Sequence, residues 1–105
     1  MAKINALPFR LAICQLAPTS SYKLSNIQIA VRAVAKAASN PSKPDLIVLP
    51  EIWNSTYAVT GFREFSEKIP AVGSMGGEGD GETVSAMREM ARSSGAWLIG
   101  GTFTR

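Results

Sequence analysis

Three short apolar runs without polar alternation constrain the fold of this chain most. They are FRLAICQL at 9–16, LIVL at 46–49 and WLI at 97–99. A strand with one face in water alternates apolar and polar residues, whereas a strand covered on both faces is apolar throughout. Each run is separated from the next by a segment long enough for a helix. The pattern predicts two strand–helix–strand units with largely parallel strands, and hence an α/β fold.

The first helix is predicted between the first two apolar runs. We expect it to run from Tyr22 to Ser39, with Ser20 or Ser21 as its N-cap. The breaker sequence NPSKP at 40–44 then ends it. Its apolar residues are three or four positions apart, so they form one helical stripe. They are Leu24, Ile27, Val31, Val34 and Ala38.

The second helix is predicted from Glu82 or Thr83 to Ser94, with Gly95 as its terminator. Before it, 62–69 is expected to form a short helical turn. The segment 72–81 is read as a loop rather than a phosphate cradle, because it contains acids and lacks the GxxxxGK[ST] signature. The helical residues expected to face inward are Val84, Met87, Met90 and Ala91.

Two helices can hardly cover both faces of such a sheet. Because the strands read as buried on both faces, further chain or a partner is expected to cover the face that the helices leave open.

Composition limits the class of protein. With 105 residues and 46% hydrophobic content, the chain holds at most one small globular domain. One cysteine cannot close an internal disulfide, and the N-terminus lacks the apolar core of a secretory signal. No apolar run is long enough for a membrane span, and the basic residues are not clustered with aromatics as in a nucleic-acid surface. We therefore expect no membrane or nucleic-acid partner, and a cytoplasmic location with a mitochondrial one as the alternative.

Glu51 is the first candidate for chemistry. It follows the second apolar run directly after Pro50, which cannot donate to a sheet ladder and so ends the strand. In open α/β sheets, ligands bind in the crevice beyond the carboxyl ends of the strands. The sequence therefore predicts that Glu51 lies at the mouth of a ligand site.

The elements and the residues at their ends resemble the N-terminal part of the nitrilase (carbon–nitrogen hydrolase) superfamily. LPEIWNSTY at 49–57 and the later LIGGT look most like the ω-amidase branch, whose members hydrolyse small dicarboxylic acid monoamides. Residues 1–105 are therefore interpreted as a partial domain of this family, with 1–8 as a flexible leader. The resemblance rests on FRLAICQL, DLIVLPE, NSTY and WLIGGT.

The resemblance implies a fold and a mechanism. The fold is the N-terminal part of an α-β-β-α sandwich of two stacked sheets, which forms a homodimer through helix packing. The catalytic residues are a Glu, a Lys and a Cys, of which only the Glu is carried over, onto Glu51, as the general base. The family's Lys and Cys come after the GG-ending strand and match no residue here, so the chain alone is expected to be inactive. The implied partner is a small amide substrate, with no cofactor and no metal.

Residues beside Glu51 have two interpretations. Asn54 and Tyr57 are candidate substrate-binding residues, and the alternative is that they close the loop by packing and local hydrogen bonds. Trp53 and Phe62 are predicted to be packing residues.

Two other residues resemble catalytic groups only by type. Cys14 lies inside an apolar run, where a free cysteine behaves as a small hydrophobe with a raised pKa. Lys68 lies in the polar segment SEKIP, where a solvated surface position is the normal fate of a lysine. Neither is assigned to catalysis.

Three functions remain open from the sequence. The first is an amidase of the carbon–nitrogen hydrolase type. The second is a non-catalytic product that binds a full-length subunit through its uncovered sheet. The third is an unrelated flavodoxin-like or Rossmann-like domain, which the lack of a phosphate-binding glycine turn after the first strand disfavours.

Overall fold

The computed structural model describes residues 7–16, 22–55, 63, 66–67, 70 and 80–101. Within them, two helices and three strands follow the predicted order. The elements are β1 (Leu11–Ile13), α1 (Lys23–Ala38), β2 (Leu46–Val48), α3 (Glu82–Ser94) and β3 (Trp97–Ile99).

The strands form one parallel sheet in the order β1-β2-β3. The middle residues of the three strands, Ala12, Ile47 and Leu98, lie in one row across it. The predicted α/β class with parallel strands is therefore confirmed. Strand β1 pairs over three residues, Leu11–Ile13, whereas the apolar run that predicted it spans 9–16. Since the strands are parallel, their carboxyl ends share one edge.

The helices agree closely with the sequence. Helix α1 is one residue shorter at each end than predicted, because its first backbone bond runs from the Asn26 N–H to the Tyr22 carbonyl. Its N-cap is Tyr22, without a side-chain cap, so the prediction of Ser20 or Ser21 as N-cap is wrong. Helix α3 has the predicted bounds, and Gly95 ends it in the left-handed conformation at φ 68°.

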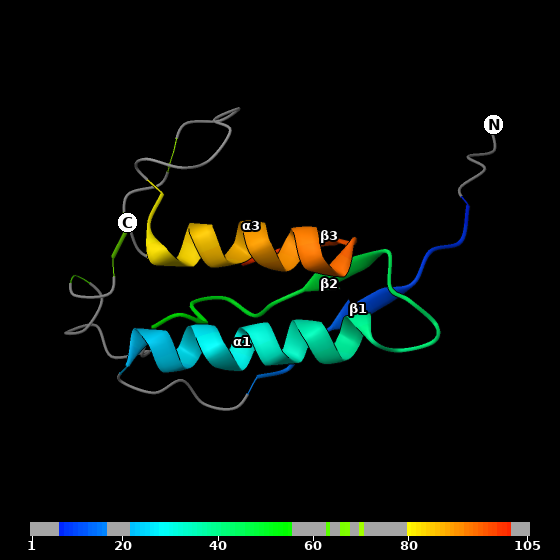
Figure 1. Cartoon of the computed structure of the whole chain (residues 1–105), viewed down its shortest axis with the longest axis horizontal. Helices are drawn as coiled ribbons and strands as arrows, with labels where there is room; N and C mark the ends of the chain where they lie inside the picture. Colours follow the sequence, from blue (N-terminus) through cyan, green and yellow to red (C-terminus); the bar gives the residue numbers. More distant parts are fainter. Residues whose placement is uncertain are drawn as a thin grey trace, which may run out of the picture.

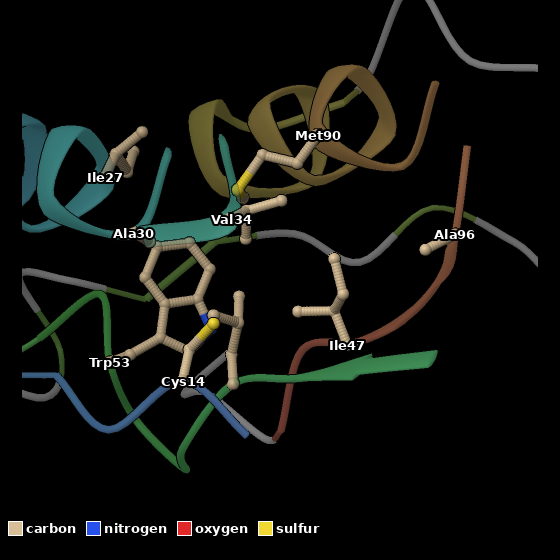
Figure 2. Packing of buried hydrophobic residues seen from close by; sticks show 9 residues of the cluster. Cys14, Ile27, Ala30, Val34, Ile47, Trp53, Met90 and Ala96 are labelled. Carbon is tan, nitrogen blue, oxygen red and sulfur yellow. The ribbon is translucent and has the colours of Figure 1, made fainter. Parts of the chain in front are cut away.

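The core lies on one face of the sheet, beneath α1 and α3, which lie side by side (Figure 1). Val34 of α1 and Met90 of α3 project toward the sheet (Figure 2), where Ile47 is fully buried. Met87 is partly buried against this cluster. The buried apolar residues are Cys14, Ile27, Ala30, Val34, Ile47, Leu49, Trp53, Met90 and Ala96.

The opposite face of the sheet is apolar and exposed within the described part of the chain. Ile13 and Trp97, in the two outer strands, are 73% and 82% exposed, and Leu11 and Ile99 are also exposed. Strands alternate their side chains between the two faces, so burial by two helices on one side leaves these residues uncovered. As expected from the sequence, the two helices leave one face of the three-stranded sheet uncovered.

Expressed by itself, the 105-residue chain is expected to self-associate through this face, because exposed apolar patches on sheets favour association. Light scattering after size-exclusion chromatography measures the self-association, because the average molar mass of the particles then rises with protein concentration. Trp97→Lys should lower the associated fraction, whereas Leu24→Lys, at an exposed position of α1, should not. A monodisperse wild-type monomer with a cooperative urea transition contradicts this expectation.

Candidate active site

Glu51 begins the turn that follows the central strand β2, and its side chain is exposed. Two residues, Leu49 and Pro50, separate it from the last paired residue of the strand. It therefore lies just beyond the carboxyl edge of the sheet, where the sequence predicts it and where ligands bind in α/β sheets.

The turn after Glu51 contains an unusual backbone conformation. Ile52 has φ 52°, the single positive value outside glycine in the described residues. A β-branched residue in this left-handed region costs about 1–3 kcal/mol and persists only where surrounding contacts hold it. The Ser55 N–H donates to the Ile52 carbonyl oxygen at 3.3 Å and closes the turn. The residue next to Glu51 is therefore strained, and its neighbours must supply the restraint.

Trp53 supplies one restraint. Its side chain is 1% exposed and belongs to the core cluster that also contains Cys14 and Ile47 (Figure 2). Its indole N–H donates to the Gly100 carbonyl oxygen at 2.7 Å. The prediction that Trp53 is a packing residue is confirmed, and the same side chain ties the turn to the end of β3.

Gly101 supplies a second restraint, through the close approach of two backbones. It has φ 66°, and a β-carbon on it would lie 2.5 Å from the Pro50 carbonyl oxygen and 3.0 Å from the Glu51 α-carbon. A side chain does not fit there. The chain leaving β3 is thus packed directly against the backbone of Glu51.

Gly101→Ala is expected to lower the free energy of unfolding by about 2–4 kcal/mol, because it adds both a left-handed strain and a backbone overlap. Gly95→Ala is the matched control: its φ is 68°, but open space surrounds the added methyl. It should cost about 1–2 kcal/mol. Urea unfolding measures both, and equal losses would show that the contact with Glu51 is unimportant.

Asn54 lies in the interior at the end of the same turn. It is fully buried, and its Nδ2 donates to Thr83 Oγ1 at 3.0 Å. Thr83 is the second residue of α3 and is also fully buried. This arrangement supports the alternative in which Asn54 closes the loop by hydrogen bonding, and its contact with substrate stays a prediction.

Glu67 is a buried acid that the sequence did not single out. Its side chain is 7% exposed, and its Oε2 is 3.0 Å from Nζ of Lys23, the first residue of α1. The Thr83 N–H donates to Oε1 at 2.9 Å, and the Thr83 hydroxyl donates to Oε2. Glu67 thus joins the N-termini of the two helices. No local pattern signals this, since its contacts depend on the tertiary fold.

The pKa of Glu67 reflects opposing effects. Burial raises it, but the hydrogen bonds from Thr83 and the contact with Lys23 together outweigh burial and hold the pKa below its ordinary value. The carboxylate is therefore ionised at neutral pH.

A lowered pKa in the folded state makes stability depend on pH. The contribution of Glu67 is fully present above the unfolded pKa, about 4.3, and is lost as the pH falls through the lower folded value. We expect the free energy of unfolding to decrease over this acid range, and Glu67→Gln to make the decrease smaller. Urea unfolding from pH 7 to pH 3 measures it. An unchanged pH slope in the variant contradicts the assignment.

Other residues considered from the sequence are placed as follows. Cys14 is a buried free cysteine whose pKa is raised by burial, as predicted for a packing residue. Tyr57, Phe62 and Lys68, like most of 1–8, lie outside the described residues.

Within the described part, no group of three or more His, Cys, Asp or Glu could hold a metal ion. Neither described helix is long and apolar enough to cross a membrane.

Comparison with known proteins adds to this geometry. The model of the carbon–nitrogen hydrolase family matches residues 10–105. The chain belongs to the carbon–nitrogen hydrolase family. Among curated relatives it is 37% identical over 94 residues to the omega-amidase NIT2 of Danio rerio and to the chloroplastic omega-amidase of Arabidopsis thaliana. It is 36% identical over 94 residues to the omega-amidase NIT2 of Homo sapiens. The resemblance to this family and to its ω-amidase branch is confirmed.

The matched region is a minor part of these carbon–nitrogen hydrolases. It covers 90% of this chain but 29% of the zebrafish and human proteins and 23% of the Arabidopsis protein. The chain therefore spans less than a third of the length of these relatives.

Proposed function

We propose that the protein carrying this chain is an amidase that hydrolyses a small dicarboxylic acid monoamide to the acid and ammonia, with Glu51 as general base. The observation that carries the proposal is the position of Glu51: an exposed carboxylate directly after the central strand, in a strained turn held by Trp53 and Gly101. Family membership and the similarity to omega-amidases support it. Strain retained beside a candidate base is typical of functional sites.

In the proposed reaction Glu51 moves protons. It takes the proton of a cysteine thiol, and the thiolate attacks the amide carbon to form a tetrahedral oxyanion. A lysine stabilises this oxyanion, and Glu51 returns the proton to the leaving ammonia. Glu51 then takes a proton from water, and the resulting hydroxide attacks the thioester carbon. The C–S bond breaks to release the acid, and Glu51 returns the proton to the sulfur, which regenerates the thiol. The cysteine and lysine are not assigned to residues of this chain, and Cys14 is excluded because it is buried in the core.

Tyr57 is proposed to line the substrate pocket. A second sheet of the protein carrying this chain is proposed to cover the exposed face formed by Leu11, Ile13, Trp97 and Ile99. We propose a homodimer in the cytoplasm, with the mitochondrion as the alternative compartment.

Ammonia release tests the function. The protein carrying this chain is incubated with succinamate, and propionamide serves as a control amide that lacks the carboxylate of succinamate. We expect ammonia from succinamate, a lower rate with propionamide, and loss of the activity after alkylation with iodoacetamide. No ammonia from either amide, or activity that survives complete alkylation, contradicts the proposal.

A second candidate function is favoured by the exposed sheet face: the 105-residue chain binds a full-length subunit without catalysis. Co-expression of the two chains with different tags tests it. A stable complex that Trp97→Lys disrupts supports binding, whereas separate elution of the two chains contradicts it.

A further inference from the structure

We propose that Glu67 is a positioning residue for the turn that carries Glu51, and that it acts through Thr83 and Asn54. The inference rests on the proposed function only in naming Glu51 as the base. Its physical content is a chain of hydrogen bonds from a buried carboxylate to the residue that ends the turn.

Both oxygens of Glu67 are held by Thr83. The backbone N–H of Thr83 donates to Oε1 at 2.9 Å and its hydroxyl donates to Oε2. This N–H is one of the donors that the start of a helix leaves without an intrahelical partner, and a negative charge there is favourable. Gly81 makes the arrangement possible, since a β-carbon at that position would overlap Glu67 Oε1. The carboxylate is thus fixed at the beginning of α3.

The charge on Glu67 sets the direction of the next hydrogen bond. An ionised carboxylate only accepts, so the one hydroxyl hydrogen of Thr83 points to Glu67. Toward Asn54, Thr83 Oγ1 can then only accept. The side-chain amide of Asn54 must therefore donate from Nδ2 to Thr83 Oγ1, and the distance between these atoms is 3.0 Å. The amide oxygen, Oδ1, then points away from Thr83. Oδ1 is buried and has no hydrogen-bond partner among the described residues. The amide orientation is hence imposed by Glu67 and Thr83.

Asn54 transmits this restraint to Glu51 because they occupy one short turn. Two residues, Ile52 and Trp53, separate them in sequence, and the Ser55 N–H to Ile52 carbonyl bond closes the turn. Trp53 anchors the middle of the turn to β3, and Asn54 anchors its end to α3. With the second anchor removed, the positive φ of Ile52 is free to relax, and the Glu51 side chain moves with it.

A purely structural role for Glu67 makes a different prediction. If Glu67 only joined α1 to α3 through Lys23, removal of the Thr83 hydroxyl would lower stability without a specific effect on the turn. The test therefore needs a readout at the turn and a matched perturbation at the same end of α3. The ion pair of Asp80 with Arg88 provides the second, since Asp80 lies two residues before α3 begins and Arg88 lies in the middle of the helix.

The experiment compares Thr83→Val, Thr83→Ser and Arg88→Met in the protein that carries this chain. Hydrogen–deuterium exchange of the peptide covering 51–55 is measured together with kcat and KM for succinamate. We expect Thr83→Val to raise exchange in 51–55 and to lower kcat about 10- to 100-fold with little change in KM, as displacement of a catalytic group does. Thr83→Ser restores both, and Arg88→Met changes neither.

The two readouts separate this inference from the proposed function. Faster exchange of 51–55 in Thr83→Val, in a protein that releases no ammonia, supports the positioning network and contradicts the amidase. Unchanged exchange and kcat in a folded Thr83→Val variant overturn the inference, as does an equal effect of Arg88→Met. Glu67→Gln provides the same comparison if Thr83→Val does not fold.

Discussion

Replacing Trp53 by alanine is expected to lower the free energy of unfolding by about 3–5 kcal/mol, the usual cost of truncating a buried tryptophan. The side chain is 1% exposed and is part of the cluster between the sheet and the helices. Its removal leaves a cavity and an unpaired carbonyl at Gly100. Chemical unfolding of the protein carrying this chain measures the loss.

Trp53→Phe is the control that separates packing from hydrogen bonding. It keeps an aromatic ring in the core but removes the indole N–H, so we expect a smaller loss of about 1–3 kcal/mol. A loss below about 1 kcal/mol for Trp53→Ala would be incompatible with a side chain that anchors the turn.

The regular elements of the fold were predictable because their signals are local. Helix α3 is defined by an apolar stripe and by a glycine, Gly95, at its C-terminal end, and both patterns can be read from the sequence. The start of α1 was predicted less well, since Tyr22 takes the N-cap position without a side-chain hydrogen bond. The apolar runs predicted the correct succession of elements along the chain and the parallel direction of the strands, but the paired ladder of β1 is shorter than its apolar run.

The position of Glu51 was also predictable, because an acid after an apolar strand and a proline is a local pattern. The contacts that hold its turn were not. The positive φ of Ile52 has no sequence signal, since β-branched residues rarely adopt it. The approach of Gly101 to Pro50 joins two strand ends far apart in the chain. The restraint on the turn that begins at Glu51 is therefore a property of the tertiary structure.

Asn54 illustrates the same limit for a single side chain. From sequence, substrate binding and loop closure were equally open for it. Its complete burial and its hydrogen bond to Thr83 depend on where α3 begins relative to β2, which no local pattern specifies.

Glu51→Gln is the variant with the largest expected effect on function. The amide keeps the size and polarity of the side chain but cannot take a proton from a thiol or from water. Because the Glu51 side chain is exposed, the substitution should leave the free energy of unfolding nearly unchanged. Glu51→Asp is the matched variant, which keeps the carboxylate but shortens its reach.

The rate of ammonia release from succinamate by the wild-type protein and by Glu51→Gln, at equal folded concentration, tests the central claim most directly. Loss of a general base predicts a decrease of about 10²- to 10⁴-fold with unchanged unfolding, and partial activity in Glu51→Asp. A folded Glu51→Gln variant that retains more than about a tenth of the wild-type rate would contradict the assignment of Glu51 as the base.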